Sequence, residues 1–149
     1  MITLNNIHEF TDQEVFDYVT EQLLIQNKRS GDISKCYYRS DDGSKCAVGL
    51  MMDDYQKEFD YCKRDQNIEG RVVWNSMPLV RILKNFYPNA VPRFRLLMVL
   101  QYIHDYFEPE EWQIIFPETR KELFNNQYSQ VIKNYNGLIA KIKEYHESI

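Results

Sequence analysis

Residues 91–107 include a strongly apolar stretch that any fold of this chain has to bury. The segment from Leu96 to Leu100 offers apolar side chains around the whole circumference of a helix, which is typical of a helix at the centre of a domain. Pro92 stands near the start of this segment, where a proline is tolerated. The polar exceptions recur at helical spacing and therefore share one face; they are Gln101, His104, Asp105 and Glu108. We predict a central buried helix with one polar stripe.

Several further helices are indicated by caps and periodicity. Thr11 and Glu14 form a capping box, which predicts a helix from there to about Asn27. Residues 72–86 have a helical pattern, with Pro78 suited to the first turn of a helix that begins near Ser76. The acidic and aromatic residues 53–61 fit either a short helix or an irregular lid.

The last part of the chain predicts a long helix over residues 118–147, after a break at Pro117. Apolar residues recur there with alternating spacings of four and three, a pattern that forms a coiled-coil seam or packs along the body of its own domain. The first reading implies a homodimer. Its seam consists of Phe124, Tyr128, Val131, Tyr135, Leu138 and Ile142.

Residues 35–50 differ from their surroundings and predict a small β-hairpin. Asp42-Gly43 is a strong signal for a two-residue turn. In that register Arg39 faces Cys46, and Cys36 and Cys46 point to opposite faces of the hairpin. A three-residue loop would reverse this relation, because a slip by one residue turns every side chain of one strand to the other face.

The fold class predicted from these elements is α+β and predominantly helical. Four or five helices surround the central buried helix, with one small hairpin and a long C-terminal helix. At 149 residues, the chain fits a single domain, residues 1–149, that can bury a substantial core. Within it we distinguish a body, residues 1–117, from the C-terminal helix, residues 118–149.

Charge and composition exclude several function classes. The net charge is −4 and no basic run stands out, so we expect no nucleic-acid partner. No apolar run approaches the roughly 18 residues that a membrane span needs, and the N-terminus shows no signal peptide. Three cysteines without an export signal point to free thiols in a reducing cytosol. We therefore expect a cytoplasmic protein without a membrane partner.

Two kinds of reactive site are open to these residues. Cys46 with His104 and Asp105 offers a thiol nucleophile, a base and an orienting acceptor, although side chains adjacent on a helix diverge by about 100°. The alternative is a buried structural cysteine. A zinc site would draw on Cys36, Cys46, Cys62 and His104, but it lacks the short spacing of zinc knuckles. We expect no catalytic residues, no metal and no cofactor.

Binding is the other role open to the hairpin and the polar stripe. Arg39 can hold a carboxylate or phosphate in bidentate fashion, for example in a nucleotide, or it can pair with Asp41, Asp53 or Asp54. The acidic cluster Asp41-Asp42 and Asp53-Asp54 offers ligands for a hard cation, or consists of solvated residues and turn formers. Gln101, His104 and Asp105 can form the floor of a pocket, or fix the hairpin to the central helix. The candidate binding residues are Tyr38, Arg39, Gln101 and His104.

Motifs that contain several of these residues resemble those of a known family. The sequence has Cys36-x-Tyr38-Arg39, then Gly43-x-Lys45-Cys46-Ala47-Val48-Gly49, and later Leu100-Gln101-x-x-His104-Asp105. In these motifs the chain resembles a family of small uncharacterised proteins of bacteriophages, prophages and bacteria, over residues 3–112. The resemblance implies a phage or mobile-element context, in which small acidic proteins often inhibit host proteins. It supplies no catalytic residues. Leu50 stands where the family pattern favours Cys or His.

The sequence therefore predicts a non-enzymatic accessory protein in the cytoplasm of a bacterial host. We expect it to bind a host protein, as an inhibitor of a defence or regulatory system. One alternative is an enzyme that uses Cys46 and His104. Another is a protein that sequesters a small ligand such as a nucleotide. We interpret the hairpin motif mainly as structural, with function on the surrounding surface or on the C-terminal helix.

Overall fold

The computed structural model describes residues 1–31, 37–66, 72–75, 77–124, 140 and 144. Five α-helices are present in this part of the chain: α1 (Asp12–Gln26), α2 (Glu58–Tyr61), α3 (Leu79–Phe86), α4 (Phe94–Tyr106) and α5 (Pro109–Phe124). Short 3-10 turns cover Ile7–Glu9, Gly49–Met51 and Pro88–Arg93. Two strands, β1 (Cys62–Gln66) and β2 (Val72–Asn75), complete the described elements.

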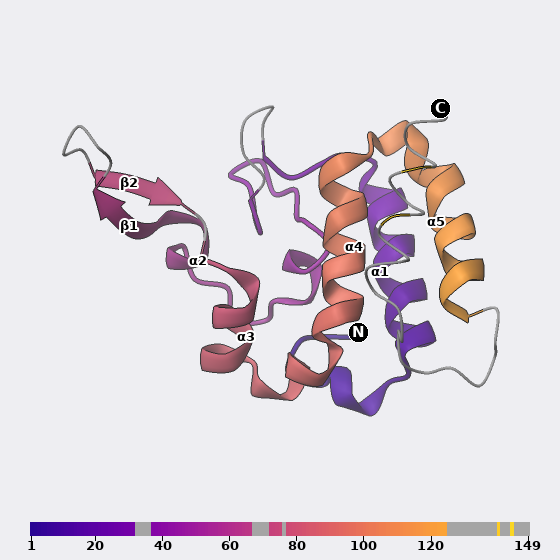
Figure 1. The fold of residues 1–149 in the computed structure, drawn as a ribbon, viewed down its shortest axis with the longest axis horizontal. Helices are drawn as coiled ribbons and strands as arrows, with labels where there is room; N and C mark the ends of the chain where they lie inside the picture. The colour runs from indigo at the N-terminus through magenta and orange to yellow at the C-terminus, as the bar shows by residue number, and fades with distance from the viewer. Residues whose placement is uncertain (32–36, 67–71, 76, 125–139, 141–143, 145–149) are drawn as a thin grey trace.

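Helices α1, α4 and α5 lie side by side and form the main body (Figure 1). α5 runs antiparallel to α1 (Figure 1). As predicted, α4 is buried along most of its length, because its apolar residues cover most of its circumference; the buried ones are Leu96, Leu97, Val99, Leu100 and Ile103. We define loop 37–49 as the described residues that lead into the 3-10 turn Gly49–Met51, up to its first residue. Its Cys46, Ala47 and Val48 pack into the same core.

The predicted start of α1 is confirmed at the level of individual hydrogen bonds. The Thr11 hydroxyl accepts the Glu14 N–H at 3.2 Å, and the Glu14 carboxylate accepts the Thr11 N–H at 3.1 Å. This reciprocal pair satisfies two of the donors that a helix start leaves free. The helix ends at Asn27, whose left-handed backbone (φ 49°) is one that asparagine adopts more readily than most residues.

The predicted α+β class is wrong: apart from the short strands β1 and β2, the fold is all-α. Within residues 37–50 no strand forms; a single bridge joins Arg39 to Lys45. The turn holds three residues between Ser40 and Ser44, not two. The N–H groups of Tyr38 and Arg39 donate to the Asp60 carboxylate. A side chain thus takes the place of a partner strand.

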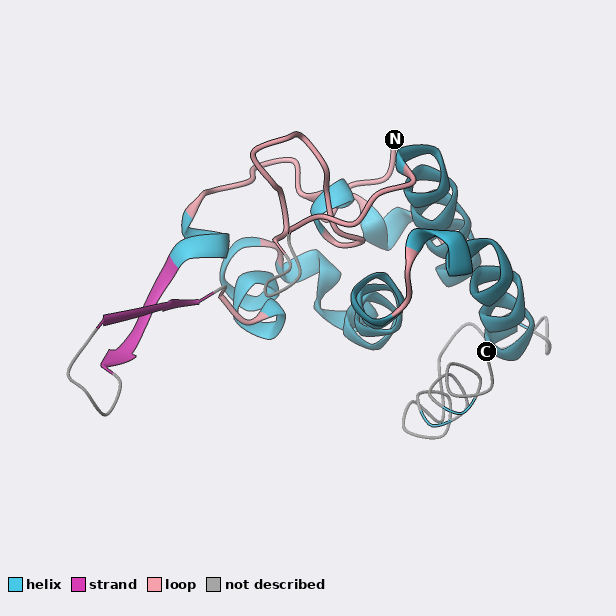
Figure 2. Cartoon of the chain, turned by 90° about the horizontal axis from the view of Figure 1, so that it is seen from above, coloured by secondary structure: helices cyan, strands magenta, loops and turns pink. Residues whose placement is uncertain are grey.

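The two strands form a separate antiparallel ribbon that projects from the helical body (Figure 2). Cys62 pairs with Asn75 and Lys63 with Trp74. Residues 72–75 were expected to be helical; instead the helical part of this segment begins at Leu79, after Pro78. Pro78 fixes an extended conformation on the residue before it and cannot donate a hydrogen bond.

The expected break at Pro117 is also absent, because α5 runs through it to Phe124. Proline removes one donor from the helix, which would have bonded to the carbonyl of Gln113. Both residues lie on the exposed side of α5, where water can serve that carbonyl. Phe124 packs edge-on against Phe16 of the same chain at 5.7 Å. The remaining seam residues, Tyr128 to Ile142, lie outside the described residues.

Two glycines in this region offer a matched test of the loop packing. A Cβ on Gly49 would lie 1.8 Å from the Tyr38 carbonyl oxygen, whereas a Cβ on Gly43 would meet nothing within 4 Å. Gly43 has a positive φ of 89°. We expect Gly49→Ala to lower the free energy of unfolding by about 3 kcal/mol or more through steric overlap, and Gly43→Ala by about 1 kcal/mol through backbone strain.

Chemical denaturation of the two variants and the wild type measures both effects. Similar losses for Gly49→Ala and Gly43→Ala would contradict the close contact between Gly49 and Tyr38.

Candidate functional site

His104 is fully buried, and both of its ring nitrogens are engaged. Its Nε2 accepts the backbone N–H of Ser30 at 3.2 Å, and its Nδ1 lies 2.8 Å from the Asp105 carboxylate. Because Nε2 accepts a hydrogen bond, the ring hydrogen is on Nδ1, which donates it to Asp105. The ring also stacks on Trp112 with a centroid distance of 5.7 Å. The imidazole is therefore fixed in position.

Gln101 connects the same carboxylate to the loop 37–49. Its amide nitrogen donates to Asp105 at 2.9 Å, and its amide oxygen accepts the Val48 N–H at 3.3 Å. The predicted polar stripe thus lies against the loop, and its hydrogen bonds go to Ser30 and Val48. These contacts fit a structural role, since buried polar groups need partners.

Cys46 is fully buried and its thiol is a hydrogen-bond acceptor. The Gly49 N–H donates to Sγ at 3.2 Å. Burial raises the pKa of the Cys46 thiol far above its ordinary value, and the charges of Asp105 and Asp60 raise it further. Nucleophilic cysteines need the opposite shift. His104 cannot act as the base, because both of its nitrogens are already engaged with Ser30 and Asp105.

Arg39 turns its guanidinium toward backbone carbonyls. It donates to the Met52 oxygen and, at 3.5 Å, to the Gly49 oxygen. It also lies over the Tyr55 ring, 5.1 Å from the centroid, which is a cation–π geometry. These contacts hold Arg39 in the loop and engage part of the guanidinium fork that a bound phosphate would use.

Asp60 is the residue of this region that the sequence analysis missed. Its carboxylate is fully buried and accepts hydrogen bonds from the Tyr38 N–H at 2.7 Å, the Arg39 N–H at 3.3 Å and the Tyr55 hydroxyl. Burial, together with the hydrogen bond to this carboxylate, raises the pKa of Tyr55. Tyr38 itself donates its hydroxyl to the Met77 carbonyl at 2.8 Å. The sequence signal for Asp60 is weak: one acid between Phe59 and Tyr61.

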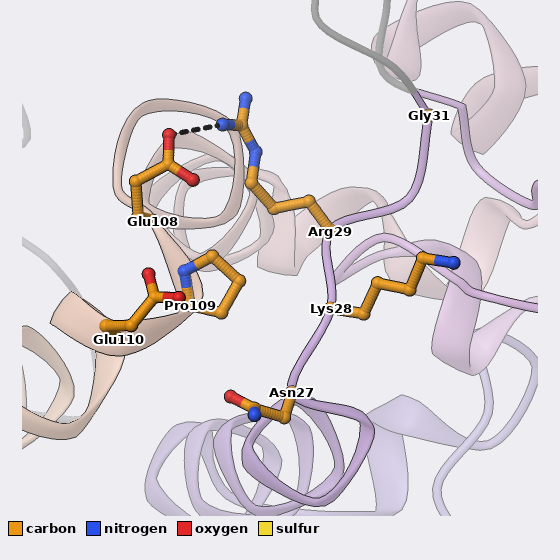
Figure 3. Close-up of a pocket in the computed structure, with 7 residues that line it drawn as sticks. All are labelled: Asn27, Lys28, Arg29, Gly31, Glu108, Pro109 and Glu110. Carbon is orange, nitrogen blue, oxygen red and sulfur yellow. Dashed lines mark hydrogen bonds and ion pairs between the residues drawn. The ribbon is translucent and has the colours of Figure 1, made fainter.

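The described residues also line a hollow of about 620 Å³ between the end of α1 and the start of α5 (Figure 3). Arg29 reaches across it to Glu108 at 3.1 Å, and also donates to the Asp105 carbonyl at 2.6 Å. Lys28 points away from the hollow (Figure 3) and pairs with Asp42. Hydrogen bonds from Lys28 and Ser44 lower the pKa of Asp42. The lining residues are Asn27, Lys28, Arg29, Gly31, Glu108, Pro109 and Glu110.

The zinc and cation hypotheses find no geometric support in the described residues. No group of three or more His, Cys, Asp or Glu side chains there is arranged to hold a metal. Cys36 lies outside the described residues, so the relation of Cys36 to Cys46 stays a prediction. In the part of the chain that the structure covers, no helix is both long and apolar enough to cross a membrane.

Comparison of the chain with protein-family models, with curated proteins and with solved structures finds no match. The resemblance to small phage and prophage proteins therefore stays a prediction from the motifs.

The burial of Cys46 generates a direct prediction. In the folded protein we expect Cys46 to react with iodoacetamide at least about tenfold more slowly than free cysteine at neutral pH, because the thiol is both inaccessible and protonated. Mass spectrometry of the digested protein separates Cys46 from Cys36 and Cys62. The same reaction in denaturant is the control and should label Cys46 fully. Labelling of folded Cys46 at the rate of free cysteine would contradict this arrangement.

Proposed function

We propose that this chain is a non-enzymatic accessory protein of a phage or other mobile element, which binds a protein in the cytoplasm of its bacterial host. The phage context rests on the motif resemblance. The binding role rests on a surface that α1 and α5 present to solvent. Inhibition of a defence or regulatory system is the outcome that this context favours.

The observation that carries the proposal is a set of exposed apolar side chains on the helix pair α1 and α5. Three of the large apolar side chains in the described residues that remain exposed lie on this pair: Leu24, Ile25 and Ile114, with exposed fractions of 40%, 72% and 52%. Ile25 and Ile114 lie on the sides of their helices opposite the buried residues. Apolar side chains gathered on one surface are typical of protein interaction sites.

The geometry weighs against the two alternatives. A cysteine-dependent enzyme needs an accessible thiolate and a free base, and neither Cys46 nor His104 offers one. A nucleotide site at Arg39 needs the guanidinium directed at the phosphate, but it already donates to the carbonyls of Met52 and Gly49. Tyr38 and Arg39 belong to the loop 37–49, Gln101 accepts the Val48 N–H, and His104 accepts the Ser30 N–H. We therefore place the binding surface on α1 and α5.

Capture of host proteins by matched variants tests this proposal. We expect the wild type to retain a host protein from a bacterial lysate, and Ile25→Glu to reduce its recovery at least about tenfold, because a charge at the centre of an interface is costly. Val80→Glu is the control: Val80 is 42% exposed on α3, away from α1 and α5 in both views (Figures 1 and 2).

Quantitative mass spectrometry of the retained proteins provides the measurement. The proposal fails when no retained protein responds to Ile25→Glu, or when Val80→Glu has the same effect.

A further inference from the structure

The helix pair α1 and α5 has a defined register, which places its exposed residues relative to one another. Asp17 of α1 binds Arg120 of α5 through two hydrogen bonds, of 2.8 Å and 3.1 Å. Asn27 lies ten residues after Asp17, and Glu110 lies ten residues before Arg120. Both line the same hollow. The two helices therefore stay side by side over this whole length. In this register Leu24 is level with Gln113, next to Ile114.

The outward side of the pair follows from helical spacing. α1 buries Val15, Val19 and Leu23, so Glu21 and Ile25, four residues apart, lie on its opposite side. α5 buries Trp112, Ile115 and Phe116, so Glu110 and Ile114 share its outward side in the same way. We define the outer face as Glu21, Leu24, Ile25, Glu110 and Ile114. It combines aliphatic side chains with carboxylates.

The charge of the outer face is not balanced within the described residues. The cations beside it already have acidic partners: Lys28 pairs with Asp42, Arg29 with Glu108, and Arg120 with Asp17. Lys121, two turns beyond Ile114 in α5, lies 3.5 Å from Glu118. No ion pair or hydrogen bond within the described chain engages the Glu21 or Glu110 side chains. The face therefore presents unneutralised negative charge beside its apolar residues, and complementary charge favours association.

The hollow extends this surface at the Glu110 end. Figure 3 shows the Glu110 carboxylate and the Asn27 amide on the side away from the Arg29–Glu108 pair. A basic side chain that enters from solvent meets the Glu110 carboxylate, with the Asn27 amide close by. Such a side chain gains a charge-assisted hydrogen bond. An acidic side chain is repelled there.

From these observations we propose that the outer face binds a segment of the partner protein that carries a basic side chain next to aliphatic ones. The aliphatic side chains pack on Ile25 and Ile114, and the basic group enters the hollow and pairs with Glu110. This inference rests on the proposed function and adds the chemistry of the partner. Acidic and uncharged segments bind more weakly.

Selection from a library of random linear peptides tests the chemistry without knowledge of the partner. The full chain is the bait. Peptides that bind the wild type but do not bind the Ile114→Asp variant are those that bind the outer face. We expect these peptides to contain Arg or Lys near aliphatic residues. For a synthetic peptide of this set, Glu110→Gln should weaken binding about tenfold, while Val80→Asp should leave it unchanged. Isothermal calorimetry measures the affinities, and circular dichroism checks that each variant is folded.

The outcomes separate the two proposals. Outer-face peptides that are acidic or uncharged, or that bind Glu110→Gln as tightly as the wild type, overturn the partner chemistry and leave the binding role in place. A selection in which no peptide is sensitive to Ile114→Asp overturns the outer face itself. Host capture by the Ile25→Glu and Val80→Glu variants remains the separate test of the proposed function.

Discussion

The fold depends on the hydrogen bonds that helices supply to a partly buried loop. The backbone of loop 37–49 enters the core without forming a strand, so its donors and acceptors need other partners. Gln26 of α1 accepts the Lys45 N–H and donates to the Lys45 carbonyl, each at 2.9 Å. Asp60 at the end of α2 accepts two N–H groups, and Gln101 of α4 accepts the Val48 N–H. Side chains from three helices thus do the work of a neighbouring strand.

This constraint explains the residue types in the motif around Cys46. Gly49 is required because the Tyr38 carbonyl oxygen occupies the space where a Cβ would be. Cys46 is small enough for the core and accepts the Gly49 N–H. Arg39 satisfies the carbonyls of Gly49 and Met52, where the chain makes a short 3-10 turn. A group of residues that resembles an active site in sequence is therefore accounted for by polar satisfaction in a core.

The predictions from the sequence are correct where a local signal is sufficient to determine the structure. The capping box at Thr11 predicted the start of α1, and the apolar run from Leu96 to Leu100 predicted the buried α4. Asp42-Gly43 does form a turn, but a turn signal fixes neither the length of the strands nor the register. The turn encloses one more residue than expected.

The missed features depend on contacts between distant residues. The Tyr38 N–H donates to Asp60, which lies 22 residues away in the chain. No periodicity in the sequence indicates that pairing. Strand β1 carries mostly polar residues (Cys-Lys-Arg-Asp-Gln), so it lacks the alternation that marks a half-buried strand. The hollow and the outer face were likewise invisible, since they follow from the register of α1 against α5.

Amide hydrogen exchange of loop 37–49 tests the central claim most directly. The account predicts that the amide protons of Tyr38, Lys45 and Val48 exchange almost as slowly as those in the middle of α4, because each donates to a side chain fixed in a helix. Exchange of these three amides at the rate of an exposed loop would contradict it, because the motif would then be accessible to solvent.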